Sequence, residues 1–186
     1  MRSMQDDIAK ILLHESTILA RLDELAYQIT QDYREKPLTV IGILNGSCLF
    51  LADLLRRIPI PLQIDCLSIA SYHGGLESSG AVAFRQSELP NVAGRHVLLV
   101  DDILDTGVTL HVVCEKIGSL EPLSLRTCVL LKKDVPRKAE FDADYVGFAI
   151  PNEFVVGYGL DYQQHYRNLP FIGVLSEEAI SNPSKV

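Results

Sequence analysis

The feature that most constrains the fold of this chain is an apolar run that changes abruptly into acidic and small residues. Residues 97–100 (Val-Leu-Leu-Val) predict a buried strand, because short continuous aliphatic runs are typical of strands covered on both faces. The acidic pair Asp101 and Asp102 follows at once, and we expect the strand to end there. A small-residue segment, 105–109, leads into a helical pattern over 110–117. This order predicts a loop at the carboxyl end of a strand, where open α/β sheets bind ligands.

The residue types in this loop favour a ligand that carries a phosphate. The first turn of a helix has unpaired backbone N–H groups and a partial positive charge, so it can bind an anion. Gly107 permits close approach of the backbone, and the hydroxyls of Thr106 and Thr109 can add hydrogen bonds. The nearby carboxylates repel a phosphate and must serve sugar hydroxyls, Mg²⁺ or a proton in transit. A ligand with a phosphate, a diol and a metal-bound second anion would use every group.

Two other interpretations of the acidic residues explain less. They could be ordinary residues near a helix start, where negative charge is favourable, but this leaves the small residues unexplained. The segment from Asp101 to Asp105 also fits the Asp-Asp-x-x-Asp metal motif of prenyl-transferring enzymes. That motif lies inside long helices, whereas here a predicted strand precedes it and Gly107 follows it.

Length and charge exclude several other classes of protein. A chain of 186 residues is expected to form a single domain, 1–186, with a sizeable core. The net charge of −7 argues against nucleic-acid binding, because such proteins usually carry a basic excess. No apolar run reaches the roughly 20 residues that a membrane span requires, and the N-terminus does not resemble a signal peptide. We therefore expect a cytoplasmic protein with no membrane partner.

The cysteines are consistent with a reducing compartment. They are widely spaced and lie in apolar segments, so we expect reduced core residues at Cys48, Cys66, Cys114 and Cys128. A zinc site would require closer pairs.

Strand-like and helix-like segments alternate along the chain. Helical patterns occupy 16–33, where Ser16 or Thr17 could be the cap, 48–57 and 110–117. Strands are predicted at 8–13, 38–44, 63–70, 81–85, 97–100, 125–131, 145–150 and 171–175. This alternation predicts an α/β fold with a central, mainly parallel sheet and helices on both faces.

Several segments also resemble a known family. Residues 97–110 resemble the phosphoribosyl pyrophosphate signature of the type I phosphoribosyltransferases. The run 145–162 (Tyr-Val-Gly-Phe-Ala-Ile-Pro-Asn-Glu-Phe-Val-Val-Gly-Tyr-Gly-Leu-Asp-Tyr), with Arg167 after it, resembles the purine-salvage branch, the hypoxanthine phosphoribosyltransferases. Shorter matches lie at 41–47, 71–72 and 130–133. They occur in the family's order, so the resemblance covers nearly the whole chain.

The resemblance implies a fold and a reaction. The fold would be that of the type I phosphoribosyltransferases, with a small hood built from the N- and C-terminal segments. Hypoxanthine, and also guanine, would react with phosphoribosyl pyrophosphate to give IMP or GMP and pyrophosphate, with Mg²⁺ as cofactor. The polar segment 71–80 would be a mobile loop that excludes water during catalysis. The protein would be a homodimer or homotetramer.

Roles around the sugar and the metal follow from the same resemblance. Asp105 would be the catalytic acid or base at purine N7, although a helix-capping role would also suit its position. The ribose and phosphate would be bound by Asp101, Asp102, Asp105, Thr106, Gly107, Val108 and Thr109. The metal would be bound through Asp101, Asp102 and Asp161.

The remaining implied roles concern the leaving group and the base. Pyrophosphate would be bound by Asn45, Gly46, Ser71, Tyr72 and Arg167. Lys132, rather than the neighbouring Lys133, would donate a hydrogen bond to the exocyclic oxygen of a 6-oxopurine. Phe154 would stack on the base, unless it is a core residue, and Val155 would offer backbone groups to the purine edge.

Two positions depart from the family pattern. Asp101 stands where the family usually has Glu, so its carboxylate is one methylene shorter. Asn45 stands where the family often has Lys, which removes a cation near the pyrophosphate; backbone N–H groups of Gly46 and Ser47 can bind an anion instead. In relatives this loop can contain a non-proline cis peptide, which would fall at Leu44–Asn45 here.

Other functions on the same fold make different demands. A non-catalytic regulator that binds a nucleotide usually loses the catalytic acid or gains a basic surface, but Asp105 is present and the chain is acidic. A pyrimidine or adenine enzyme is disfavoured by Lys132 and by Phe154–Val155. The sequence does not choose among hypoxanthine, guanine and xanthine, nor between a dimer and a tetramer.

Overall fold

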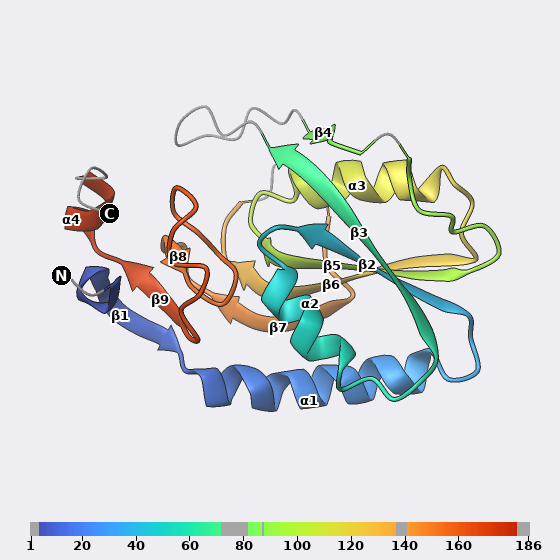
Figure 1. The fold of residues 1–186 in the computed structure, drawn as a ribbon, viewed down its shortest axis with the longest axis horizontal. Coiled ribbons are helices and arrows are strands. Elements are labelled where there is room, and N and C mark those ends of the chain that lie inside the picture. The colour runs from blue at the N-terminus through green and yellow to red at the C-terminus, as the bar shows by residue number, and fades with distance from the viewer. Residues whose placement is uncertain (1–3, 72–81, 87, 137–140, 182–186) are drawn as a thin grey trace.

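The centre of the molecule is a six-stranded sheet. The computed structural model describes residues 4–71, 82–86, 88–136 and 141–181. The strand order is β4-β3-β2-β5-β6-β7 (Figure 1). The bounds are β2 (Leu38–Leu44), β3 (Leu62–Ser71), β4 (Val82–Phe84), β5 (His96–Leu104), β6 (Ser124–Lys133) and β7 (Tyr145–Ile150). All pairs from β3 to β7 are parallel, and β4 pairs antiparallel with β3.

Helices cover both faces of this sheet. Helices α1 (Glu15–Asp32) and α2 (Cys48–Leu55) lie on one side, and α3 (Val108–Gly118) lies on the other (Figure 1). One hydrophobic cluster joins α1 and α2 to the sheet, and a second packs α3 against the opposite face. Strands covered on both sides must be apolar throughout, which explains why residues 38–43 of β2 are all buried. The predicted α/β architecture is confirmed.

Helix α1 buries the apolar stripe that its periodicity predicted. The buried side chains are Ile18, Leu22, Leu25, Ala26 and Ile29, with Tyr33 just beyond the helix. The predicted cap was wrong. The helix begins at Glu15, so Ser16 and Thr17 lie inside its first turn and His14 occupies the N-cap without a side-chain hydrogen bond.

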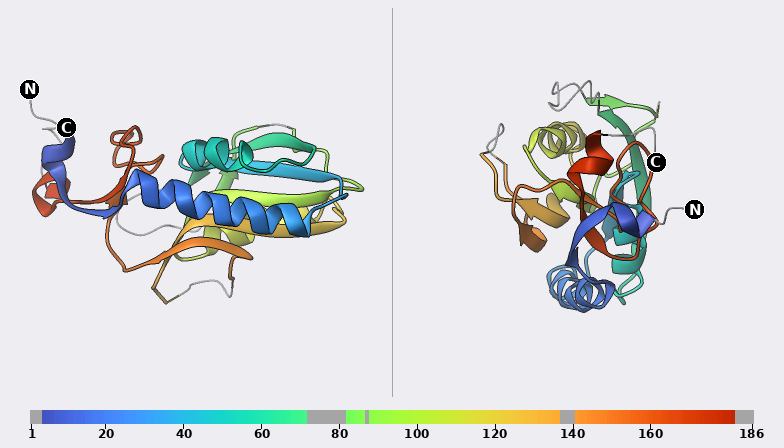
Figure 2. Two further views of the ribbon diagram at one scale, coloured as in Figure 1. Left: turned by 90° about the horizontal axis from the view of Figure 1, so that it is seen from below. Right: turned by 90° about the vertical axis from the view of Figure 1, so that its left-hand side faces the viewer.

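A small antiparallel sheet forms the expected hood. It has the order β1-β9-β8 and consists of β1 (Ile8–Leu13), β9 (Ile172–Leu175) and β8 (Val155–Val156). It brings the two ends of the described chain together, where a short 3₁₀ helix (Met4–Asp7) and α4 (Glu177–Ser181) lie side by side (Figures 1 and 2). The N–H of Ser176, just before α4, donates to the carbonyl of Asp7 at 2.9 Å and links these ends, and the buried hydroxyl of Tyr166 donates to Asp7 Oδ2 at 2.9 Å. Sequence patterns did not predict the short elements β8 and α4.

The boundaries around the acidic pair also differ from the prediction. Strand β5 continues through Asp101 and Asp102 to Leu104, because the long strand β6 pairs with it as far as Lys132. Helix α3 begins two residues early, at 108, because Gly107 adopts a left-handed conformation and ends the loop. The two acids therefore belong to the end of a strand rather than to a turn.

The cysteines only partly meet the expectation of reduced core residues. All four are free, but Cys48 is exposed and Cys128 alone among them is fully buried. Cys48 is the first residue of α2, on the side of that helix that the sheet does not cover. In the described part of the chain, no helix is long and apolar enough to cross a membrane.

Candidate active site

The acidic pair lies at the carboxyl end of the central strand β5. Asp101 is buried, and its Oδ1 accepts a hydrogen bond from the backbone N–H of Asp102 at 3.0 Å. Burial raises the pKa of both carboxyl groups, and repulsion from Asp102 raises that of Asp101 further. Arg167 has the opposite influence on the pKa of Asp102. Two adjacent carboxylates of this kind, one buried and one half-buried, are stabilised by a cation or by hydroxyl donors from a ligand.

The loop after β5 has the geometry of an anion site. Gly107 is the N-cap of α3 with a φ of 82°, a left-handed conformation that favours glycine. Asp105, Thr106, Val108 and Thr109 are half-buried around it. The first backbone N–H groups of a helix have no partner within the helix, so those of α3 are available to an anion. The structure therefore brings the predicted phosphate residues together.

A second loop reaches the acidic pair from strand β2. The Leu44–Asn45 peptide bond is cis, as the resemblance implied. Gly46 packs so closely on Asp102 that a Cβ atom would lie 1.6 Å from its Oδ2. Gly159, with a φ of 104°, approaches the same loop, and its Cβ would lie 2.0 Å from the carbonyl oxygen of Gly46. A side chain at Gly46 would collide with the carboxylate of Asp102, and one at Gly159 with the backbone of Gly46, so three segments that are distant in sequence meet here.

Arg167 connects this meeting point to Asp161. Its Nη1 donates to the carbonyl of Gly159 at 2.7 Å, and its Nη2 lies 2.7 Å from Asp161 Oδ1. The second carboxylate oxygen of Asp161 accepts from the backbone N–H of Gln164 at 2.8 Å. The predicted pyrophosphate residue and the predicted metal ligand are thus paired with each other. Asn45, the third predicted pyrophosphate residue in this region, has an exposed side chain.

The two lysines at the end of β6 face different partners. Lys133 Nζ lies 3.3 Å from Asp105 Oδ2, and only 13% of the Lys133 side chain is exposed. Lys132 Nζ instead lies 2.8 Å from Asp142 Oδ2, in a more exposed pair. Successive residues of a strand point to opposite faces, so only one of them can share a face with Asp105. The structure brings Lys133, which the sequence analysis set aside, to Asp105 and does not bring Lys132 there.

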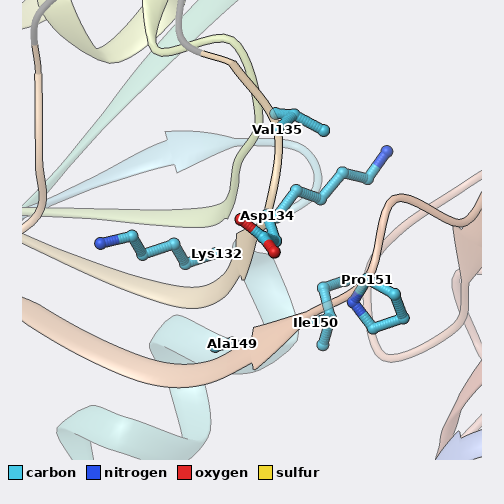
Figure 3. Close-up of a pocket in the computed structure, with 7 residues that line it drawn as sticks. Lys132, Asp134, Val135, Ala149, Ile150 and Pro151 are labelled. Atoms are coloured by element: carbon cyan, nitrogen blue, oxygen red, sulfur yellow. The ribbon is translucent and has the colours of Figure 1, made fainter.

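A cavity of about 570 Å³ opens beside these lysines. It is lined by residues 132–135 of β6 and the following loop and by 149–151 at the end of β7 (Figure 3). The figure shows the Lys132 side chain directed away from Val135 and Pro151. The cavity therefore lies at the carboxyl ends of parallel strands, where the sequence predicted a ligand.

Phe154 lies at the start of the hood. Its side chain is 41% exposed, so the alternative that it is a core residue is wrong. It packs edge-to-face on Tyr162, with ring centroids 5.5 Å apart. Val155 is buried and pairs through its backbone with Val174 in β9. An exposed aromatic ring held at a fixed angle is suited to stack on a planar ligand.

Two parts of the predicted site, the loop after β3 and the metal ligands, are only partly seen in the described residues. The predicted mobile loop over 71–80, with Tyr72, lies outside the described residues except for Ser71, which is described only as the last residue of β3. Within 4–71, 82–86, 88–136 and 141–181, no group of three or more His, Cys, Asp or Glu side chains is arranged to hold a metal ion. An Mg²⁺ ion bound by one or two carboxylates and completed by substrate oxygens does not require such a group.

Comparison with known proteins gives one consistent result. The profile of the phosphoribosyl transferase domain matches residues 9–163. The chain is 46% identical to the hypoxanthine-guanine phosphoribosyltransferase of Staphylococcus aureus, over 96% of this chain and 100% of that protein. It is 45% identical to the protein of that name from Streptococcus pneumoniae, over 96% and 99% of the two chains. A crystal structure of a Staphylococcus aureus hypoxanthine phosphoribosyltransferase superimposes with a TM-score of 0.92 at 46% identity, covering 98% and 100%.

Proposed function

The chain belongs to the phosphoribosyl transferase family, and from this premise we propose that it is a purine-salvage enzyme. It transfers the phosphoribosyl group of phosphoribosyl pyrophosphate to hypoxanthine, and to guanine, and releases pyrophosphate. The observation that carries this proposal is the pairing of Asp105 with Lys133 beside a cavity at the end of the parallel sheet. An acid and a cation at this distance can serve N7 and the neighbouring exocyclic oxygen of one 6-oxopurine.

Asp105 is the proposed catalytic acid or base. Purine N7 must exchange a proton as the base bonds to the sugar, and a positioned carboxyl group can carry it. Asp105 follows the last residue of β5 and is half-buried between the phosphate loop and Lys133. Because the first turn of α3 attracts an anion, the terminal phosphate of the substrate is expected at residues 105–109, which places its ribose near Asp105.

The purine oxygen is assigned to Lys133 instead of Lys132. The Lys133 ammonium shares the face of Asp105, whereas Lys132 is engaged by Asp142. An ammonium group donates a hydrogen bond to the 6-oxo group of a purine but cannot bond to the amino group of adenine, which is itself a donor. Lys133 would therefore select 6-oxopurines. Phe154 is proposed to stack on the base, and backbone groups at Val155 to contact its edge.

The pyrophosphate subsite is proposed where Gly46, Asp102 and Arg167 meet. Arg167 supplies a guanidinium, which suits phosphate oxygens. The backbone N–H groups of the loop at Gly46 and Ser47 replace the cation that Asn45 does not provide. This subsite lies next to the acidic pair, so the ribose hydroxyls and the leaving group converge on one strand end.

Mg²⁺ is the proposed cofactor. Asp101 and Asp102 are oxygen donors next to the pyrophosphate subsite, and Asp161 is a third after it exchanges its contact with Arg167. When bound, the ion neutralises charge on the substrate's pyrophosphate. The chain itself holds the ribose hydroxyls, moves the proton at N7 through Asp105 and donates to the purine oxygen through Lys133.

The direct test is a base-preference assay. The protein is incubated with phosphoribosyl pyrophosphate and Mg²⁺, with hypoxanthine, guanine, xanthine, adenine or uracil offered separately, and the nucleotide formed is quantified. Conversion of hypoxanthine, with or without guanine, supports the proposal. Failure to convert any base while phosphoribosyl pyrophosphate still binds would support the regulator, and conversion of adenine or uracil alone would overturn the assignment of Lys133.

The exposed surface and the cysteines bear on the number of subunits and on the cellular compartment. We propose a homodimer or homotetramer in the cytoplasm. Large apolar side chains remain exposed on the protomer, among them Tyr27, Ile64 and Leu123, and contacts between subunits would cover such surface. The four free cysteines suit a reducing compartment. Sedimentation equilibrium measures the number of subunits directly.

A further inference from the structure

A partly buried hydrogen bond links the hood side of the proposed pyrophosphate subsite to helix α2. The hydroxyl of Tyr158 donates to Asp53 Oδ2 at 2.5 Å. We propose that Tyr158 is a positioning residue, which through Asp53 holds Gly159 and Arg167 in the geometry that binds the pyrophosphate of the substrate. This inference rests on the proposed function and adds to it a residue that touches neither the substrate nor the reacting atoms.

The bond is well placed to act as a rigid connection. Tyr158 is 3% exposed and belongs to the main hydrophobic cluster beneath α1 and α2. Burial and the hydrogen bond to Asp53 both raise the pKa of the Tyr158 phenol, so it remains a donor throughout the working pH range. The other carboxylate oxygen of Asp53 accepts from Arg56, so the acceptor is itself held in place.

The backbone at Tyr158 indicates that its side chain is required there. Tyr158 has a φ of 49° and lies between Gly157 (φ of 96°) and Gly159 (φ of 104°). Glycine adopts such left-handed conformations freely, whereas any other residue pays a conformational penalty. A tyrosine in the middle of this run is therefore retained for its contacts, and its hydroxyl makes one polar contact, to Asp53.

The residue that Tyr158 would position lies directly next to it in the chain. The residue after Tyr158 is Gly159, which abuts the carbonyl of Gly46 in the pyrophosphate loop. The carbonyl of Gly159 accepts from Arg167 Nη1 at 2.7 Å, and its N–H donates to the carbonyl of Arg167 at 2.9 Å. Helix α2 begins directly after that loop, with the N–H of Cys48 bonded to the carbonyl of Asn45 at 3.1 Å. The bond from Tyr158 to Asp53 thus completes a closed chain of contacts, which runs from the loop at Gly46 through α2 to the hood and back to Gly46.

Removal of the hydroxyl should weaken one subsite selectively. In Tyr158→Phe the aromatic ring keeps its packing, but Gly159 and Arg167 are no longer tied to α2. We expect KM for phosphoribosyl pyrophosphate to rise about tenfold and inhibition by product pyrophosphate to weaken by a similar factor, as for loss of about one charged hydrogen bond. KM for hypoxanthine should change much less, because Lys133 binds the base from β6, outside this closed chain of contacts.

The test is a double-mutant cycle with a matched control. Tyr158→Phe, Asp53→Ala and the double variant are compared with the wild type for both KM values and for pyrophosphate inhibition. The control is Tyr145→Phe, which removes a tyrosine–aspartate bond of the same length, from the first residue of β7 to Asp32 at the end of α1 at 2.5 Å, together with the hydrogen bond that the Tyr145 hydroxyl accepts from Arg126. All variants are also compared by thermal unfolding, so that a loss of stability is measured separately from a loss of binding.

Each outcome decides the inference. Support requires that both single variants raise KM for phosphoribosyl pyrophosphate, that the double variant raises it no further, and that Tyr145→Phe lowers Tm without affecting KM. Equal rises in both KM values, or a rise in Tyr145→Phe as well, would show a merely structural role and overturn the inference. An inactive wild type would contradict the proposed function itself, whereas an active wild type with an unmoved KM in Tyr158→Phe contradicts only the positioning role.

Discussion

The two lysines at the end of β6 allow a direct test of which ammonium contacts the purine oxygen, because they are adjacent in sequence and have different surroundings. In Lys133→Met the side chain stays unbranched and apolar along its stem, but loses the terminal ammonium and its charge. The Lys133 side chain is 13% exposed, so water cannot replace the ammonium effectively beside a bound purine. A hydrogen bond from a charged donor contributes about 1.5–3 kcal/mol, and kcat/KM for hypoxanthine should therefore fall about 10- to 150-fold.

Lys132→Met is the matched control. Lys132 pairs with Asp142, whose side chain is 63% exposed, and exposed ion pairs contribute about 0–1 kcal/mol to stability. This pair does not involve Asp105, so kcat/KM should stay at the wild-type value. Initial rates are measured at saturating phosphoribosyl pyrophosphate with varied hypoxanthine, and again with hypoxanthine saturating. The second series should give the same KM for phosphoribosyl pyrophosphate in the wild type and both variants.

A reversed result would refute the reasoning. If Lys132→Met lost activity while Lys133→Met retained it, the ammonium that contacts the purine would be Lys132, and the pairing of Lys133 with Asp105 would have no part in base recognition. Equal losses in both variants, with matching losses of Tm, would attribute the effect to folding of the strand end.

Three further variants test other parts of the site and its scaffold. Asp105→Asn should lower kcat by about 10²–10⁴-fold while calorimetry still detects binding of phosphoribosyl pyrophosphate, and unchanged turnover would exclude proton transfer by Asp105. Asn45→Lys should strengthen product inhibition by pyrophosphate, because it adds a cation at the exposed edge of that subsite; identical inhibition constants would contradict this. Hydrogen bonding from Tyr145 and attraction to Arg126 lower the pKa of Asp32 below 3.8. The ionised Asp32 carboxylate therefore contributes its full stability to the folded state above pH 3.8, and this contribution is lost as the pH falls through the lowered pKa. Tyr145→Phe should therefore lower Tm near neutral pH, and the difference from wild type should shrink as the buffer is taken below pH 3.8, whereas a constant difference would exclude the linkage.

The parallel sheet could be predicted because burial on both faces imposes a local pattern. The strands over 38–44 and 145–150 have the predicted bounds, since their apolar runs end at Asn45 and at Pro151. The end of β5 could not be predicted in the same way. Asp101 and Asp102 have low strand propensity, and pairing with the long strand β6 overrides it.

The choice between Lys132 and Lys133 depended on the face of the strand that each occupies. A run of buried residues, 127–131, carries no alternation from which the facing of the next residue could be read. The register with β5, where Leu104 lies opposite Lys132, determines that facing, and register is a property of two strands. Either lysine matched the local pattern, and the contact with Asp105 separates them.

The contact between Gly46 and Gly159 shows why the proposed pyrophosphate subsite could not be predicted from the sequence. Each glycine has a local explanation as a turn residue, and neither explanation refers to the other. Their contact exists because the hood returns the chain over the end of β2, where the Gly159 backbone reaches the Gly46 carbonyl and Asp102 packs on the other side of Gly46. A side chain at Gly46 would collide with the Asp102 carboxylate, and one at Gly159 would collide with the Gly46 backbone, so each substitution disturbs a second segment as well as its own turn. The geometry of the proposed pyrophosphate subsite therefore depends on the absence of side chains at two distant positions, which composition and spacing alone cannot connect.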